Sequence, residues 1–130
     1  MIIPTPEQPK SRKHSQPEAR LQAACVEWLW NAFPATRGNF IHIPNEGNRS
    51  NKIDGALRKA LGLVPGAPDT FLFLPRGGFH GLAVEFKTPV GTQSPAQKDF
   101  QARLEANGYR YEICRTFEQF KTIITGYLSS

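Results

Sequence analysis

Two short apolar runs, separated by a turn that contains glycine, form the centre of the hydrophobic pattern. The runs are residues 66–74 and 79–87, and Pro75-Arg76-Gly77-Gly78 lies between them. Short runs rich in Phe, Leu and Val that flank such a turn predict a β-hairpin. Both runs are apolar on both faces, which is typical of strands in the middle of a sheet that is covered on each side.

Hydrophobic residues three and four positions apart predict helices around this hairpin. We expect helices over residues 17–33, 95–107 and from 117 onward, with a shorter basic helix over 52–61. The residues expected to face inward are Leu21, Cys25, Trp28, Leu29, Phe100, Leu104, Phe117, Phe120, Ile123, Ile124 and Tyr127.

Two further strands are predicted, at residues 39–43 and 109–114, which gives the order α-β-α-β-β-α-β-α. This order predicts an α/β domain with a mixed β-sheet of about four strands and helices on both faces. The hairpin is antiparallel. The last strand is reached through a helix, so we expect it to be parallel to strand 79–87 by a right-handed crossover.

Composition narrows the class of protein. The chain has 130 residues, 39% hydrophobic and 21% charged, which predicts one soluble globular domain. No apolar run reaches membrane-spanning length, so no membrane is expected as a partner. Cys25 and Cys114 lie in apolar periodic segments and are interpreted as buried free thiols of a reducing compartment.

The charge favours an anionic partner. A net charge of +5 favours nucleic acid over a membrane surface. Residues 1–15 combine three prolines with a basic cluster and predict a flexible basic arm that precedes the folded domain at 16–130. The arm either contacts phosphates or is a solvated tail. The polar loop at 44–52 either wraps a phosphate backbone or is an ordinary surface connection.

The hairpin places two carboxylates together. If the turn is centred on Gly77, Phe71 faces Ala83 and Asp69 faces Glu85, with Cβ atoms roughly 5 Å apart. Like charges opposed across a ladder are destabilising, but a hard cation between them relieves the repulsion, and carboxylate oxygens suit Mg²⁺ or Mn²⁺. Lys87 shares the face of Glu85. A metal site is therefore the leading interpretation.

Other interpretations remain open at this stage. Asp69 would be only a turn residue if the register slipped by one position, since a slip moves Glu85 to the opposite face. Glu18 extends the buried stripe of its helix, followed one turn later by Gln22, but Ser15 and Glu18 also form a capping-box pattern. The same alternative, a cap with Ser94, applies to Gln97.

The ordered motifs resemble those of the PD-(D/E)XK nuclease superfamily, and more closely those of a stand-alone VRR-NUC domain of the kind found in bacteriophages. The residues that carry the resemblance are Glu18-x-x-x-Gln22, His42-Ile43-Pro44-Asn45-Glu46-Gly47, Gly66-Ala67-Pro68-Asp69, Glu85-Phe86-Lys87, Ser94-x-x-Gln97 and Gly108-Tyr109. It implies a restriction-endonuclease-like core. It spans about residues 16–128, nearly everything except the arm.

The resemblance also implies roles for individual residues. Asp69, Glu85 and the backbone carbonyl of Phe86 would bind Mg²⁺ or Mn²⁺, and Glu18 would complete or support that site. Lys87 would orient or activate the attacking water and steady charge on the phosphate. Gln97 would position Lys87 or the scissile phosphate. The residues expected to contact nucleic acid are His42, Asn45, Arg49, Lys52, Arg76 and Ser94.

The function implied is metal-dependent hydrolysis of DNA phosphodiester bonds, structure-selective in the manner of a Holliday-junction resolvase. Symmetric cutting of branched DNA needs two sites, so a homodimer is expected, and Trp30 and Phe40 are interpreted as exposed aromatics. The expected location is the cytoplasm of a bacterial or phage-infected cell. The alternatives are a non-catalytic DNA-binding module of a phage recombination or packaging complex, or a flap, single-strand or nicking nuclease.

Overall fold

The computed structural model describes residues 16–44 and 52–130, with the side chains of 52–54 left out. The expected basic arm and the expected DNA contacts Asn45 and Arg49 lie outside these residues, as does the side chain of Lys52. The elements are α1 (Pro17–Ala32), η1 (Pro34–Thr36), β1 (Phe40–His42), α2 (Lys52–Ala60), β2 (Thr70–Leu72), β3 (Leu82–Phe86), α3 (Pro95–Ala106), β4 (Arg110–Cys114) and α4 (Phe117–Leu128). Apart from the short 3₁₀ turn η1, this order is the predicted one.

The four strands form one mixed sheet in the order β1-β2-β3-β4. The pairs β1–β2 and β2–β3 are antiparallel, whereas β3–β4 is parallel and is connected through α3. Phe71 faces Ala83, which confirms the register predicted by centring the hairpin on Gly77. Every residue of β2 and β3 is buried, as expected of central strands.

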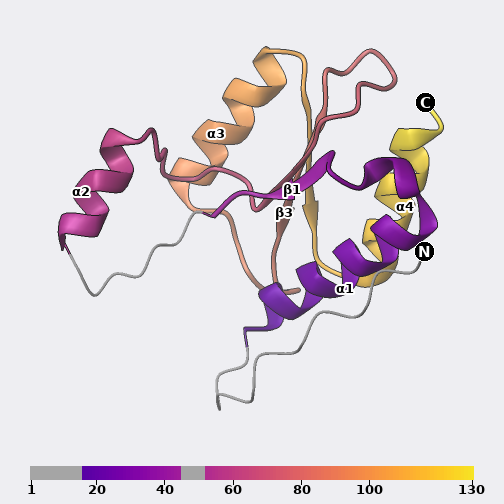
Figure 1. Ribbon diagram of the computed structural model, residues 1–130, viewed down its shortest axis with the longest axis horizontal. Coiled ribbons are helices and arrows are strands. Elements are labelled where there is room, and N and C mark those ends of the chain that lie inside the picture. Colours follow the sequence, from indigo (N-terminus) through magenta and orange to yellow (C-terminus); the bar gives the residue numbers. More distant parts are fainter. Residues whose placement is uncertain (1–15, 45–51) are drawn as a thin grey trace.

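Helices cover both faces of the sheet (Figure 1). On one face α1 and α4 pack together over the even-numbered residues of β3, with Leu29, Phe86 and Phe120 in the main core. On the other face Leu104 of α3 packs against Phe71, Ala83 and Tyr111. The side chain of Glu85 belongs to this second face, because side chains alternate along a strand.

Three helix starts show how the sequence sets the boundaries. Ser94 caps α3 in a capping box with Gln97, and Thr116 caps α4. At α1 the N-cap residue is Gln16, whose side chain makes no capping bond among the described residues, and Pro17 opens the helix. Pro17 has the fixed φ that suits a first helical position, whereas the Ser15–Glu18 capping box considered from sequence involves Ser15, which lies outside the described residues.

The two cysteines and one aromatic side chain settle further predictions. Cys25 and Cys114 are free and fully buried, as predicted. Phe40 was expected to be exposed, but it is only 1% exposed because it faces the main core and packs edge-on against Phe120. Within the described ranges, no helix combines the length and apolarity needed to cross a membrane.

Candidate active site

The site forms where β1 and β3 end and β2 begins, because antiparallel neighbours bring these termini to one edge. Asp69 immediately precedes β2, and its carbonyl oxygen accepts a hydrogen bond from the backbone N–H of Ile43 at 2.8 Å. Its side-chain Oδ2 accepts a second bond from the backbone N–H of Phe86 at 2.7 Å. These two bonds fix the Asp69 carboxylate against the end of β3.

Glu85 is the one acidic side chain of the described part that is completely buried. Its Oε1 accepts hydrogen bonds from the Tyr111 hydroxyl and, at 3.4 Å, from Nε2 of Gln93. Its Oε2 is also buried and has no hydrogen-bond partner among the described residues. A buried polar atom left unsatisfied costs about 1–3 kcal/mol, and more when it is charged. This oxygen is the strongest sign that the site binds something.

Asp69 carries the electrostatic signature of a carboxylate cluster. Burial is the main cause that raises its pKa above the ordinary value, and the negative charges of Glu85 and Glu18 raise it further. The hydrogen bond from Phe86 and the nearby His42 act in the opposite direction. Asp69, Glu85 and Glu18 therefore share one electrostatic environment, as their predicted roles require.

Phe86 and Lys87 complete this end of β3. In a strand the N–H and C=O of one residue point toward the same neighbour. Since the N–H of Phe86 bonds to Asp69, the carbonyl of Phe86 is on the Asp69 side too, where the predicted ligand is needed. The N–H of Lys87 bonds to Cys114 at 3.0 Å, which continues the β3–β4 ladder and keeps Lys87 on the Glu85 face.

Glu18 and His42 approach from the neighbouring elements. Glu18 lies in the first turn of α1 and is exposed, so the prediction that it faces the core is wrong, although its charge acts on Asp69. Nδ1 of His42 lies 2.9 Å from the carbonyl oxygen of Asp69 and 2.9 Å from Nε2 of Gln22. The first contact needs a proton on Nδ1 and the second needs its lone pair, so the tautomer of His42 decides between them.

The remaining predicted residues divide into two groups. Ser94 and Gln97 follow β3 at the start of α3, where Oε1 of Gln97 accepts a bond from the backbone N–H of Ser94 at 2.8 Å. The cap weighed against a site role for Gln97 is therefore formed. Arg76 lies in the hairpin turn at the opposite end of β3, and its charge acts on Tyr127. The structure does not bring Arg76 to this site.

Sequence reasoning missed three residues, two that bond to Glu85 and one that holds the loop of Gln93. Tyr111 comes from β4, Gln93 from the loop after β3, and Arg115 holds that loop by donating to the carbonyls of Thr88 at 2.7 Å and Gly91 at 2.6 Å. The sequence showed only that Tyr111 and Ile113 share one face of the predicted strand 109–114, whereas the pairing of Ile113 with Glu85 is known from the structure. Burial and the bond to Glu85 raise the pKa of Tyr111, so its hydroxyl stays a donor at neutral pH.

The side chains present fit a hard divalent cation. No three His, Cys, Asp or Glu side chains converge into a ready-made cage in the part of the chain that the structure describes. Mg²⁺ seldom uses such a cage, because it is bound through one or two carboxylates with water and substrate phosphate as further ligands. Asp69, the unpartnered Oε2 of Glu85 and the Phe86 carbonyl are a donor set of that kind.

Comparison with known proteins agrees with this geometry. The model of the VRR-NUC domain family matches residues 6–118, which is most of the chain. The chain belongs to the VRR-NUC domain family. Its general class is the PD-(D/E)XK superfamily named from the sequence, and it is a nuclease-type domain with a mixed four-stranded α/β fold.

Two solved structures resemble this VRR-NUC domain. A VRR_NUC domain protein is 23% identical, with a TM-score of 0.75 over 86% of this chain and 88% of that one. A second structure, named VRR_NUC domain, is 22% identical, with a TM-score of 0.52 over 85% of this chain and 96% of that one. Identities this low support the fold alone. No curated protein gave a significant match.

Proposed function

We propose that this VRR-NUC domain is a divalent-metal-dependent endodeoxyribonuclease that hydrolyses phosphodiester bonds. One observation carries the proposal: Oε2 of Glu85 is buried without a partner among the described residues, near Asp69, whose pKa is raised by burial and further by the charge of Glu85. A domain that only bound DNA would gain nothing from two carboxylates placed so close together, because they repel both each other and the phosphate backbone.

We assign each site residue a role according to its position. Asp69, Glu85 and the Phe86 carbonyl would hold Mg²⁺ or Mn²⁺, with Glu18 as a further carboxylate at the rim. When bound, the ion lowers the pKa of a coordinated water and neutralises phosphoryl charge. Lys87 extends from the same face of β3 and orients the attacking water or the scissile phosphate with its ammonium group. Gln97, whose Oε1 caps α3, would support Lys87 or the phosphate with its Nε2 amide from the start of α3.

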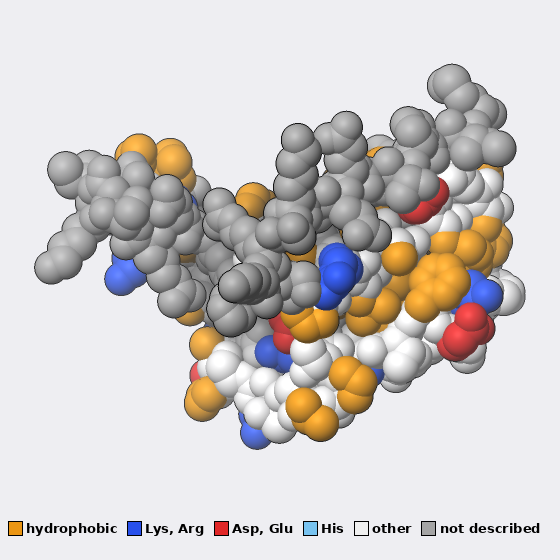
Figure 2. All heavy atoms as spheres, turned by 90° about the horizontal axis from the view of Figure 1, so that it is seen from below, with side chains coloured by type: hydrophobic (Ala, Val, Ile, Leu, Met, Phe, Trp, Pro, Cys, Tyr) orange, Lys and Arg blue, Asp and Glu red, His pale blue; other side chains and the backbone are white. Residues whose placement is uncertain are grey.

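DNA contacts would come from residues at this edge and from α2, which extends away from the sheet (Figure 1). His42 and Ser94 flank the site, and Arg58 and Lys59 lie in the last turn of α2. On the face in Figure 2, the visible Lys and Arg side chains are spaced apart, with acidic side chains among them. Lys and Arg side chains that contact phosphates position a DNA backbone without reading its sequence, which suits recognition of DNA shape.

We further propose that the substrate is branched DNA, cut by a homodimer in the manner of a Holliday-junction resolvase. Paired cuts across a junction need two sites related by two-fold symmetry. Supporting surface is present in α2 and the segment after it, which extends away from the sheet (Figure 1) and exposes Leu57, Leu61 and Val64. Sedimentation at micromolar concentration, with and without junction DNA, should give the dimer mass; monomer under both conditions would contradict this proposal.

Cleavage of a fixed DNA panel tests the activity. The panel holds a four-way junction, a flap, a duplex and a single strand, each assayed with Mg²⁺, Mn²⁺, Ca²⁺ or EDTA. We expect Mg²⁺- and Mn²⁺-dependent cleavage that Lys87→Ala abolishes while DNA binding remains. Lys121→Ala is the matched control, because Lys121 is a lysine on α4, which covers the opposite face of the sheet.

The pattern of products separates the alternatives. Symmetric cuts confined to the junction would support the resolvase assignment. Cuts in flaps, single strands or one strand of a duplex would retain the nuclease and reject junction selectivity. Tight binding without cleavage in any metal, unchanged by joint replacement of Asp69 and Glu85 with alanine, would reject the nuclease in favour of a DNA-binding module.

A further inference from the structure

The two oxygens of the Glu85 carboxylate have different surroundings. Both hydrogen-bond donors, the Tyr111 hydroxyl and Nε2 of Gln93, bond to Oε1, and none of the described residues bonds to Oε2. A carboxylate oxygen has about two lone-pair positions, so the two donors fill those of Oε1. The carboxylate is therefore held in one orientation, with one oxygen satisfied by the protein and the other left open.

Tyr111 is a rigid donor. Its ring is 5% exposed and packs with Phe71 and Ala83 in the core beneath α3. It belongs to β4, whose parallel pairing with β3 fixes the position of Tyr111 along the strand relative to Glu85. Because a buried ring has little rotational freedom, its hydroxyl can donate to Glu85 in one position only. The position of the Glu85 carboxylate therefore depends on that of the Tyr111 ring.

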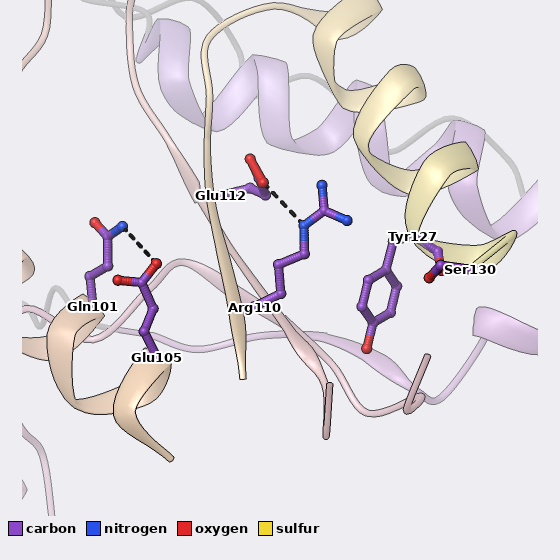
Figure 3. Close-up of polar contacts among 6 residues, drawn as sticks. All are labelled: Gln101, Glu105, Arg110, Glu112, Tyr127 and Ser130. Atoms are coloured by element: carbon purple, nitrogen blue, oxygen red, sulfur yellow. Dashed lines mark hydrogen bonds and ion pairs between the residues drawn. The ribbon is translucent and has the colours of Figure 1, made fainter. Parts of the chain in front are cut away.

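Gln93 is fixed from the other side. A second proton of its Nε2 goes to Oε1 of Gln101 at 2.9 Å, and Gln101 in turn donates to Glu105 one turn later on α3 at 3.4 Å (Figure 3). The loop that carries Gln93 is tied by Arg115 to the turn after β4. The second donor is thus attached to both α3 and β4.

We propose that Tyr111 and Gln93 are positioning residues: by occupying Oε1 of Glu85 they present Oε2 to the divalent cation. This inference rests on the proposed nuclease function, and it deepens it by naming the groups that orient the metal-binding carboxylate. Groups that bond to a ligand's other atom commonly change metal affinity by about 10- to 100-fold when they are removed. Tyr111 has the larger effect, since Gln93 reaches Oε1 only at 3.4 Å.

The test measures Mn²⁺ binding to the full chain without DNA, by calorimetry and by the electron paramagnetic resonance signal of free Mn²⁺. We expect Tyr111→Phe, which keeps the ring, to weaken Mn²⁺ binding about 10-fold or more. Gln93→Leu should weaken it severalfold. The control is Tyr127→Phe, which also removes a buried hydroxyl, one that donates to the Leu74 carbonyl at 2.7 Å. Tyr127 lies beside Arg110 (Figure 3) and belongs to the main core, on the face of the sheet opposite Glu85.

The outcomes distinguish this inference from the function on which it rests. Weaker Mn²⁺ binding in Tyr111→Phe and Gln93→Leu, with wild-type affinity in Tyr127→Phe, supports the positioning role. Wild-type affinity in folded Tyr111→Phe, or in Gln93→Leu if Tyr111→Phe does not fold, overturns it while the nuclease proposal stands. Equal weakening in all three variants shows general destabilisation and also overturns it. A wild-type protein that binds no Mn²⁺ overturns both.

Discussion

Gly66 offers the sharpest test of how the chain is brought to the site. Its φ is +85°, and a Cβ built on it would lie 2.3 Å from the carbonyl oxygen and 2.4 Å from the carbonyl carbon of Ala96, and 2.7 Å from the backbone nitrogen of Gln97. These atoms belong to the first turn of α3 and cannot rotate away. The segment that leads to Asp69 therefore passes against the start of α3 at a distance that only glycine permits.

The cost of Gly66→Ala can be worked from two contributions. A left-handed backbone costs an alanine about 1–2 kcal/mol. Forcing backbone atoms apart in a packed region adds about 1–3 kcal/mol, as overpacking does. The total is roughly 2–5 kcal/mol, a large part of the 5–15 kcal/mol typical of a domain. At about 4 °C per kcal/mol, Tm should fall by roughly 8–20 °C.

Gly38 supplies the matched control. Its φ is +78°, but a Cβ built on it would meet nothing within 4 Å. Gly38→Ala therefore carries the backbone contribution alone, about 1–2 kcal/mol. Both variants are compared by urea unfolding and by calorimetry. Equal losses of stability in the two variants would refute the reasoning, because the close approach between Gly66 and α3 would then have no energetic consequence.

Three further predictions concern the site and the core. The pKa of Asp69 in the folded state lies above its ordinary value of 3.8, so folding favours its protonated form and stability is lost as pH rises above about 4. In EDTA, the Tm of the wild-type protein should therefore fall relative to that of Asp69→Asn between pH 4 and pH 7. Parallel curves of Tm against pH for the two proteins would contradict this. Arg115→Met removes two bonds to backbone carbonyls and should cost about 1.5–3 kcal/mol, with faster amide hydrogen exchange confined to residues 88–93. Leu29→Ala, a fully buried change on the face opposite Glu85, should cost about 2–5 kcal/mol yet leave the cleavage rate per folded molecule unaltered; loss of cleavage in the folded variant would show coupling between the two faces.

The hairpin was predictable because two local rules agree there. Side chains alternate with a period of two, and a turn centred on Gly77 sets the register, so Asp69 and Glu85 could be placed at one edge before any tertiary contact was known. The buried cysteines and the caps of α3 and α4 are local features in the same sense.

The site features that could not be predicted depend on how elements far apart in the sequence are placed relative to one another. The register of β3 against β4 depends on the path of α3, so nothing in the sequence assigned Tyr111 to Glu85. Glu18 fits the periodic hydrophobic stripe of α1. The stripe does not indicate where the sheet ends, and the first turn of α1, which carries Glu18, is exposed. Arg76 is close to Glu85 in the sequence, yet the length of β3 separates them because the turn and the site are at opposite ends of the hairpin.

The pairing of α1 with α4 has a consequence for the order in which the protein becomes competent. The Trp28 ring packs edge-on against Phe117 at 6.2 Å and Phe120 at 6.0 Å, so the layer that supports one face of the sheet joins segments from opposite ends of the described chain. Every candidate catalytic residue, from Glu18 to Gln97, precedes α4. A growing or truncated chain that lacks α4 thus carries the whole reactive set but has no closed core to hold it. Contacts this far apart in the sequence slow folding, because the entropy of closing the long loop between them is lost before they form.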